Sequence, residues 1–221
     1  MKKKTNSPVD ITNRAAPDLP EELEIVDSGQ VFANPNVQLS ESLVRGIKLQ
    51  APLIKTLRLT SSVLHGVALP NAVLQTARLT DVRFVDCDLA NMQIHAMTAV
   101  RVEFAGCRMT GLRLGETEWQ SFLLSGGDQR YAQCRFAVFQ NSEFEGCDFE
   151  DADFYGADLR GCIFRRCNLR NVEMSKAKLS GADLRGSTVD GLRLAAEDIA
   201  GAIVDPAQAL TFAPLLGIKI M

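Results

Sequence analysis

The stretch CDFEDADFYGADLRGCIF, from Cys147 to Phe164, repeats itself every five residues. Phe149, Phe154, Leu159 and Phe164 lie five apart, and a small residue stands two places before each of them. An α-helix would place apolar residues three and four apart, and a flat strand would place them two apart. The period of five therefore predicts a backbone that is neither of these.

The same period continues over most of the chain. Every fifth residue from Leu39 to Ile199 is apolar except Gln129, and the residue two places before each is uncharged until Glu197. A chain that turns a corner every five residues keeps both positions inward, and four corners close a coil of 20 residues. Such coils stack by β-type hydrogen bonds about 4.8 Å apart. Each coil then buries its apolar side chains against its neighbours, as in a solenoid.

The longer stretch CDFEDADFYGADLRGCIFRRCNL resembles the pentapeptide-repeat family, whose loose consensus is A-(D/N)-L-x-x. The resemblance covers about residues 37–201 and implies a right-handed, four-sided β-helix. We therefore expect an all-β fold, a right-handed quadrilateral parallel β-helix of about eight 20-residue coils with a short C-terminal helix. The expected organisation is an N-terminal tail and cap at 1–36, the β-helix at 37–201, and a C-terminal helix with an apolar tail at 202–221.

Residues 20 apart should stack on one another if this geometry is correct. One inward column would be rich in aromatic side chains, with the members Phe84, Phe104, Leu124, Phe144 and Phe164. In another column the small Ala99 stands one coil from Trp119, the volume compensation that a packed interior requires. A third column collects four cysteines: Cys87, Cys107, Cys147 and Cys167. A thiol at such a position packs as a small apolar group.

The titratable residues do not predict a catalytic or metal site. The six cysteines form no CxxC pair, and His65 and His95 fall at outward positions on opposite faces. No phosphate-binding loop or nucleophile elbow is present, so we expect neither an enzyme nor a cofactor. The start MKKKTNSPVD lacks the apolar segment of a secretory signal, and no apolar run could span a bilayer. We expect a cytoplasmic protein with reduced thiols.

The weakest repeat is LLSGGDQRYAQC, from Leu123 to Cys134, where the polar Gln129 takes an inward position. Two interpretations remain open. Gly126, Gly127 and Asp128 could form a distorted corner in which backbone groups satisfy Gln129. Alternatively, residues 125–130 could leave the coil as a loop that contacts a partner.

Seven acids and no base occur between residues 143 and 158. They are Glu143, Glu145, Asp148, Glu150, Asp151, Asp153 and Asp158. The family resemblance extends to bacterial quinolone-resistance proteins, which implies an acidic, DNA-like rod that binds DNA gyrase or topoisomerase IV. The coil rule suggests neutralisation instead, because it stacks Glu145 on Arg165, Glu150 on Arg170 and Asp158 on Lys178. Residues 37–201 hold 19 bases and 20 acids, a net charge of −1, whereas a uniform DNA mimic should be more acidic.

The C-terminal segment predicts a capped helix with an apolar surface. Asp205 can cap its start and Pro206 suits its first turn. Leu210, Phe212, Leu215 and Leu216 are expected to pack on the last coil or to join a second subunit as a homodimer. The sequence thus favours a non-enzymatic protein-binding module that modulates a type II topoisomerase and binds neither nucleic acid nor membrane directly. The alternative is a structural scaffold or dimeric solenoid with another protein partner.

Overall fold

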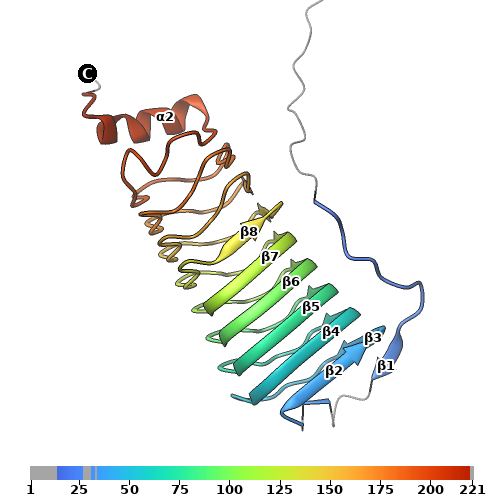
Figure 1. The fold of residues 1–221 in the computed structure, drawn as a ribbon. Helices are drawn as coiled ribbons and strands as arrows, with labels where there is room; N and C mark the ends of the chain where they lie inside the picture. The colour runs from blue at the N-terminus through green and yellow to red at the C-terminus, as the bar shows by residue number, and fades with distance from the viewer. Residues whose placement is uncertain (1–13, 27–30, 33, 220–221) are drawn as a thin grey trace, which may run out of the picture.

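The computed structural model describes residues 14–26, 31–32 and 34–219. These residues form a parallel β-solenoid of about seven turns, with one short helix at the C-terminal end (Figure 1). The strands lie side by side along the rod, and the N-terminal segment runs beside them. The predicted all-β solenoid with its C-terminal helix is confirmed.

The described strands join in one sheet, and the paired residues are parallel. The first seven are β1 (Glu24–Val26), β2 (Asn36–Ser40), β3 (Ser42–Arg45), β4 (Leu53–His65), β5 (Val73–Val85), β6 (Gln93–Ala105) and β7 (Arg113–Ser125). Three short strands follow, β8 (Val138–Gln140), β9 (Glu143–Glu145) and β10 (Ile163–Arg165). From β2 onward each residue pairs with the one 20 positions away, as Arg58 does with Arg78. The 20-residue coil read from the sequence is therefore the coil of the structure.

The corners explain the residue types between the inward positions. The residue two places after each large inward side chain has a positive φ at most corners, for example 59° at Asn71 and 66° at Gly111. Asn, Asp and Gly tolerate this left-handed region best. Thr56, Thr76 and Ala96 occupy the same place in the coil but have no positive φ. There the 13-residue strands β4 to β6 run through the corner, so one side of the rod differs between its two halves.

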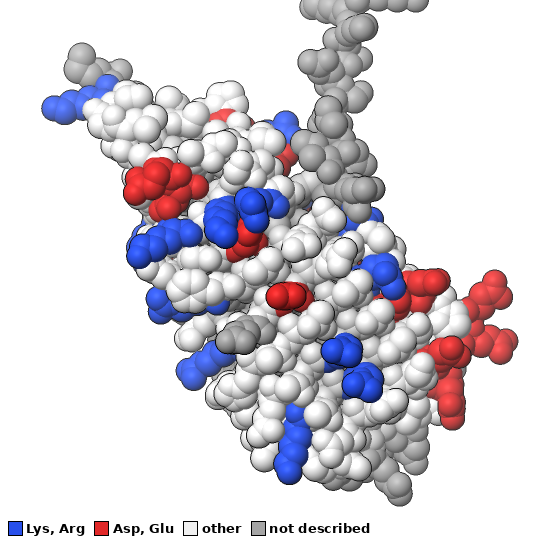
Figure 2. Space-filling model, in the orientation of Figure 1, with Lys and Arg blue, Asp and Glu red and all other residues white. Residues whose placement is uncertain are grey.

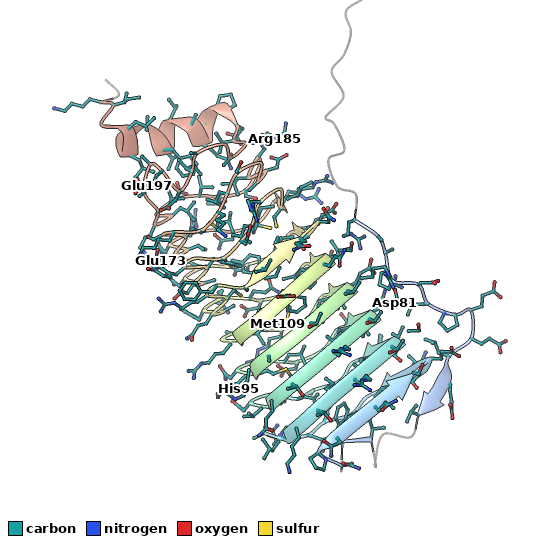
Figure 3. The ribbon with its side chains drawn as sticks, viewed as in Figure 1. Asp81, His95, Met109, Glu173, Arg185 and Glu197 are labelled. Atoms are coloured by element: carbon teal, nitrogen blue, oxygen red, sulfur yellow. The ribbon has the colours of Figure 1, made fainter. Side chains whose placement is uncertain are left out.

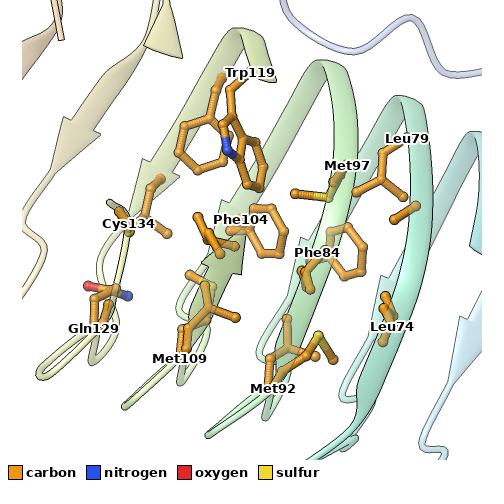
Figure 4. A pocket seen from close by; sticks show the side chains of 18 of the residues that line it. Leu74, Leu79, Phe84, Met92, Met97, Phe104, Met109, Trp119, Gln129 and Cys134 are labelled. Atoms are coloured by element: carbon orange, nitrogen blue, oxygen red, sulfur yellow. The ribbon is translucent and has the colours of Figure 1, made fainter. Parts of the chain in front are cut away.

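The interior is filled by columns of side chains from successive coils (Figure 4). Phe84 and Phe104 stack with ring centroids 4.4 Å apart and planes at 2°. Phe144 and Phe164 repeat this stack at 4.6 Å in the same column. Ala99 pairs in register with Trp119, so the volume compensation expected from the sequence is present.

All six cysteines are buried and free. Five of them occupy the small inward position, and the thiols of the stacked column donate to carbonyl oxygens of the backbone, as Cys147 does to Leu124 O at 3.3 Å. Burial raises the pKa of the Cys134 and Cys162 thiols to about 12. These thiols therefore stay protonated at neutral pH and contribute to packing.

The N-terminal segment is tied to the side of the rod by two partly buried hydrogen bonds. The Arg14 guanidinium donates to Glu103 at 3.0 Å, and the Asp18 backbone N–H donates to Asp81 Oδ1 at 2.8 Å. Asp81 also receives two hydrogen bonds of 2.6 Å from the Arg101 side chain one coil away. Figure 3 shows Asp81 at the edge that this segment passes. Residues 14–18 thus cover the charged side chains of Asp81 and Glu103, which would otherwise face solvent.

The C-terminal end of the solenoid is covered by α2 (Pro206–Phe212) and the short 3-10 helix η1 (Ala213–Leu216). The Asp205 carboxylate accepts from Gln208 N–H and the Gln208 side chain accepts from Asp205 N–H, a capping box. Gln208 Nε2 donates to two carbonyls of the last coils, at 2.6 and 2.8 Å. Because the last coil of a solenoid has unpaired edges, this cover protects it from edge-to-edge association.

The buried thiols should resist labelling in the folded protein. We expect less than about one thiol per chain to react with an aromatic disulfide reagent at pH 8, because burial suppresses both access and thiolate formation. All six should react in denaturant. Rapid labelling of Cys134 or Cys162 in the native protein would contradict their placement in the core.

The Asp81–Arg101 pair should make stability depend on pH. The Arg101 side chain holds the pKa of Asp81 below its usual range, so the stabilisation is present above pH ~4 and is lost as the pH falls through the lowered pKa. Asp81→Asn should lower the free energy of unfolding by about 2 kcal/mol at pH 7. Urea denaturation at several pH values should show the wild-type advantage shrinking below pH ~4.

Asp88→Asn is the matched control, since Asp88 pairs with Arg108 at 3.0 Å in a more exposed ladder. Its cost should stay under about 1 kcal/mol. Equal costs for the two substitutions, or a cost of Asp81→Asn that is unchanged down to pH ~2.5, would contradict the assigned role.

Candidate functional site

Most of the predicted acidic surface is neutralised by bases on the same or a neighbouring coil. Asp158 binds Arg160 at 2.7 Å and Lys178 at 3.5 Å. Asp153 lies 3.7 Å from Arg135. Asp148 lies 3.7 Å from Arg130 and accepts a hydrogen bond of 2.8 Å from Asn168. The structure thus favours the ladder interpretation for these acids.

Two of the predicted pairs are wrong in detail. Glu145 pairs its backbone with Arg165 in register, but its carboxylate binds Arg166 at the following corner. Arg170 lies 3.7 Å from Asp190 and has no ion pair with Glu150. The register was correct in both cases, but a long side chain at or near a corner can reach the acid on either adjacent coil.

Three acids of the predicted surface have no ion pair among the residues that the structure describes. They are Glu143, Glu150 and Asp151. All three are half-buried; Glu150 and Asp151 are neighbours at one corner, whereas Glu143 lies on another side of the coil. The acidic surface is therefore smaller and more divided than the linear sequence indicates.

Residues 125–130 form a corner, so the first of the two open interpretations is correct and the loop is not formed. Gly126 N–H donates to Glu145 O at 2.8 Å, and Gln129 N–H donates to Asp148 O at 2.8 Å. The Gln129 side chain is buried and donates to Gly126 O and Cys107 O at 3.0 and 3.3 Å. The ladder thus passes through this segment without interruption. Gly126 and Gly127 have positive φ, and a Cβ on Gly127 would lie 2.0 Å from Cys107 O.

Asp128 belongs to the ladder as well. It lies 2.8 Å from Arg130, which lowers the pKa of the Asp128 carboxyl to about 2. Since the loop does not form, the structure gives Gly126, Gly127 and Asp128 no special reach toward a partner.

Both histidines are exposed on the outside of the rod. His65 lies 3.9 Å from Asp86, and His95 faces outward away from the Asp81 edge (Figure 3). No group of three His, Cys, Asp or Glu side chains among the described residues could hold a metal ion. The apolar cavity between Phe104 and its neighbours measures about 60 Å³ (Figure 4). Ligand pockets are several times larger.

A groove on the side of β4 to β7 was not anticipated from the sequence. It has a volume of about 940 Å³ and runs across the coils at the corner that lacks left-handed residues. Figure 2 shows basic side chains over β4 and β5 on this face, separated from the acidic side chains of the N-terminal segment. The residue types at Thr56, Thr76 and Ala96 gave no clear signal, because left-handed corners elsewhere also carry residues other than Gly, Asn or Asp, such as Ser61 and Phe136.

No helix among the described residues is long and apolar enough to cross a membrane.

Comparison with known proteins identifies the repeat. A family model described as pentapeptide repeats (8 copies) matches residues 130–166 and 147–186. No curated protein matches the chain in sequence. Solved structures that align with this chain include trypsin-treated QnrB1, a plasmid-mediated fluoroquinolone resistance protein. It is 18% identical over 90% of this chain and 97% of that one, with a TM-score of 0.47.

HetL, a pentapeptide-repeat protein involved in heterocyst differentiation regulation from the cyanobacterium Nostoc sp. strain PCC 7120, is 17% identical over 83% of this chain and 93% of its own, with a TM-score of 0.30. Rfr23 from the cyanobacterium Cyanothece 51142 is 15% identical over 65% of this chain and 88% of its own, with a TM-score of 0.19. Likenesses this distant do not transfer a function.

The matched residues lie where positive φ recurs at every corner, from Phe136 to Gly191. The same five-residue period and 20-residue register extend back to β2. The match to the pentapeptide-repeat family therefore covers residues 130–186, and the same repeat geometry continues outside them.

Proposed function

We propose that this chain is a non-enzymatic protein-binding module. The observation that supports it is the uninterrupted coil-to-coil ladder, which holds columns of outward side chains at a spacing of about 4.8 Å. A partner protein can bind such a rigid surface with little loss of conformational entropy in this chain. The outward side chains serve binding in this proposal, and no residue is assigned a catalytic step.

The more specific form of the proposal is that the partner is a bacterial type II topoisomerase, DNA gyrase or topoisomerase IV. The unpaired acids Glu143, Glu150 and Asp151 would then take the place of DNA phosphates. The charge of the rod limits this version, because most acids near them are paired with bases. The contact would be confined to a few positions and would differ from a uniform imitation of the duplex.

Glu143→Gln, Glu150→Gln and Asp151→Asn together should weaken an effect on gyrase. We expect the protein to alter supercoiling by purified gyrase or topoisomerase IV, and the triple variant to need about tenfold more protein for the same effect. The substitutions keep the shape of each side chain and remove three charges. Plasmid supercoiling assays and co-migration on size exclusion would measure both quantities.

The matched control neutralises Glu21, Glu22 and Glu24, which are exposed on the N-terminal segment. It removes the same charge elsewhere and should leave the effect unchanged. A wild-type protein that neither changes supercoiling nor co-migrates with either enzyme would overturn the topoisomerase version.

The alternative is a scaffold that joins to a second copy through its C-terminal end. Leu210, Leu216 and Ile218 are exposed by 59%, 66% and 52%, an unusual cluster of apolar surface on a cap. Leu215 is exposed as well, whereas Phe212 is buried against the core. Phe212 therefore packs on the core, the first of the two arrangements expected for this segment, and Leu210, Leu215 and Leu216 remain for a joining surface.

Leu210→Glu with Leu216→Glu should convert a dimer into a monomer, because the two charges would be buried in the joining surface. Light scattering of the full chain at several concentrations would measure the mass. Leu53→Glu is the control, since Leu53 is 58% exposed on the side of the rod. A wild-type chain that is a monomer at all concentrations defeats this alternative.

A further inference from the structure

The groove on the side of β4 to β7 contains a pair of like charges stacked on each other. Arg58 pairs in register with Arg78, and both side chains are exposed. Neither has an acidic side chain within ion-pair distance among the residues that the structure describes. Like charges that face each other directly on a sheet destabilise it. An unoccupied groove thus carries an uncompensated positive charge.

This arrangement departs from the rest of the rod. Stacked charges elsewhere alternate, as in Asp81–Arg101, or are compensated by bases, as the stacked Asp128 and Asp148 are by Arg130. The neighbouring threonine hydroxyls do not compensate, since Thr76 donates to the Lys55 carbonyl at 3.1 Å. The arginine pair therefore provides donors for a carboxylate or another anion.

The same column changes its character along the rod. In order of coils it consists of Gln38, Arg58, Arg78, Thr98, Glu118 and Val138, each paired with the next. The charge goes from positive to neutral to negative, and the column ends on an apolar side chain. Phe136 lines the same end of the groove and is 65% exposed. Glu118 would repel a chain of evenly spaced phosphates, so a continuous polyanion is disfavoured.

Gly115 lines the groove near Glu118, and a Cβ there would lie 2.3 Å from His95 O. The backbones of neighbouring coils therefore lie close together at this end of the groove.

We propose that this groove binds an extended peptide segment of a partner protein with the order acid, base, apolar residue. Its acids lie over Arg58 and Arg78, its basic residue over Glu118, and its apolar residue against Phe136 and Val138. At about 4.8 Å per coil, the midpoint of the arginines is about 12 Å from Glu118. An extended chain covers that distance in three or four residues at about 3.3 Å each. The groove shares no residue with the three unpaired acids, so this inference is independent of the topoisomerase role.

Synthetic peptides test the proposal directly. The probe is the labelled peptide EESGKSLG, and its control is the charge-swapped peptide KKSGESLG of equal length and apolarity. Fluorescence anisotropy with the full chain should show at least about tenfold tighter binding of the probe at low salt. Arg58→Glu with Arg78→Glu should abolish that preference. The double variant Arg45→Glu with Arg113→Glu changes the charge equally outside the groove and should leave it within about twofold.

Glu118→Lys separates a peptide from a nucleic acid. Glu118→Lys should weaken binding of the probe peptide, because the peptide's lysine loses its acidic partner. The same variant would strengthen any binding of a single-stranded thymidine oligonucleotide. Circular dichroism of each variant confirms that the solenoid is folded. Equal affinity for the two peptides, equal losses in the groove and control variants, or tighter binding of the oligonucleotide than of the probe would each overturn the proposal.

Discussion

The structure depends on the hydrogen-bond ladder between residues 20 positions apart. This ladder joins each coil to the next from β2 onward, and it continues as isolated bridges after the strands shorten, as between Asp158 and Lys178. Because the register is constant, each inward side chain rests on the same place in the next coil. The stacked rings of Phe84 and Phe104 and the column of buried thiols follow directly from it. A slip of one residue would move every inward side chain outward.

The same constraint orders the charges on the outside. A base on one coil lies beside an acid on the next coil, because the ladder fixes the distance between the two positions. The two charges can therefore neutralise each other. Asp81 with Arg101 and Asp158 with Lys178 are examples. Exposed pairs of this kind add little stability each. Their main effect is to remove net charge from most of the surface, so that the remaining unpaired groups stand out. The stacked pair Arg58 and Arg78 is such a group, and it lies in the groove.

The difference between the two halves of the rod has a local cause. From Phe136 to Gly191 a left-handed residue turns the chain at every corner. In β4 to β6 the corner at Thr56, Thr76 and Ala96 lacks one, and the strand continues through it. The groove forms along this side. One feature of the backbone thus accounts both for the longer strands and for the surface that we propose as a peptide site.

The sequence by itself determined the coil, the inward columns and the burial of the cysteines. It could do so because a period of five with one unbroken phase leaves a single arrangement of corners. Tertiary structure decided which acid each long basic side chain approaches at a corner. Arg166 binds Glu145 and Arg170 approaches Asp190, since either neighbouring coil is within reach of a flexible side chain. It also decided that Gln129 stays in the ladder and that Phe212 turns inward, because backbone carbonyls and an open coil end were available to them.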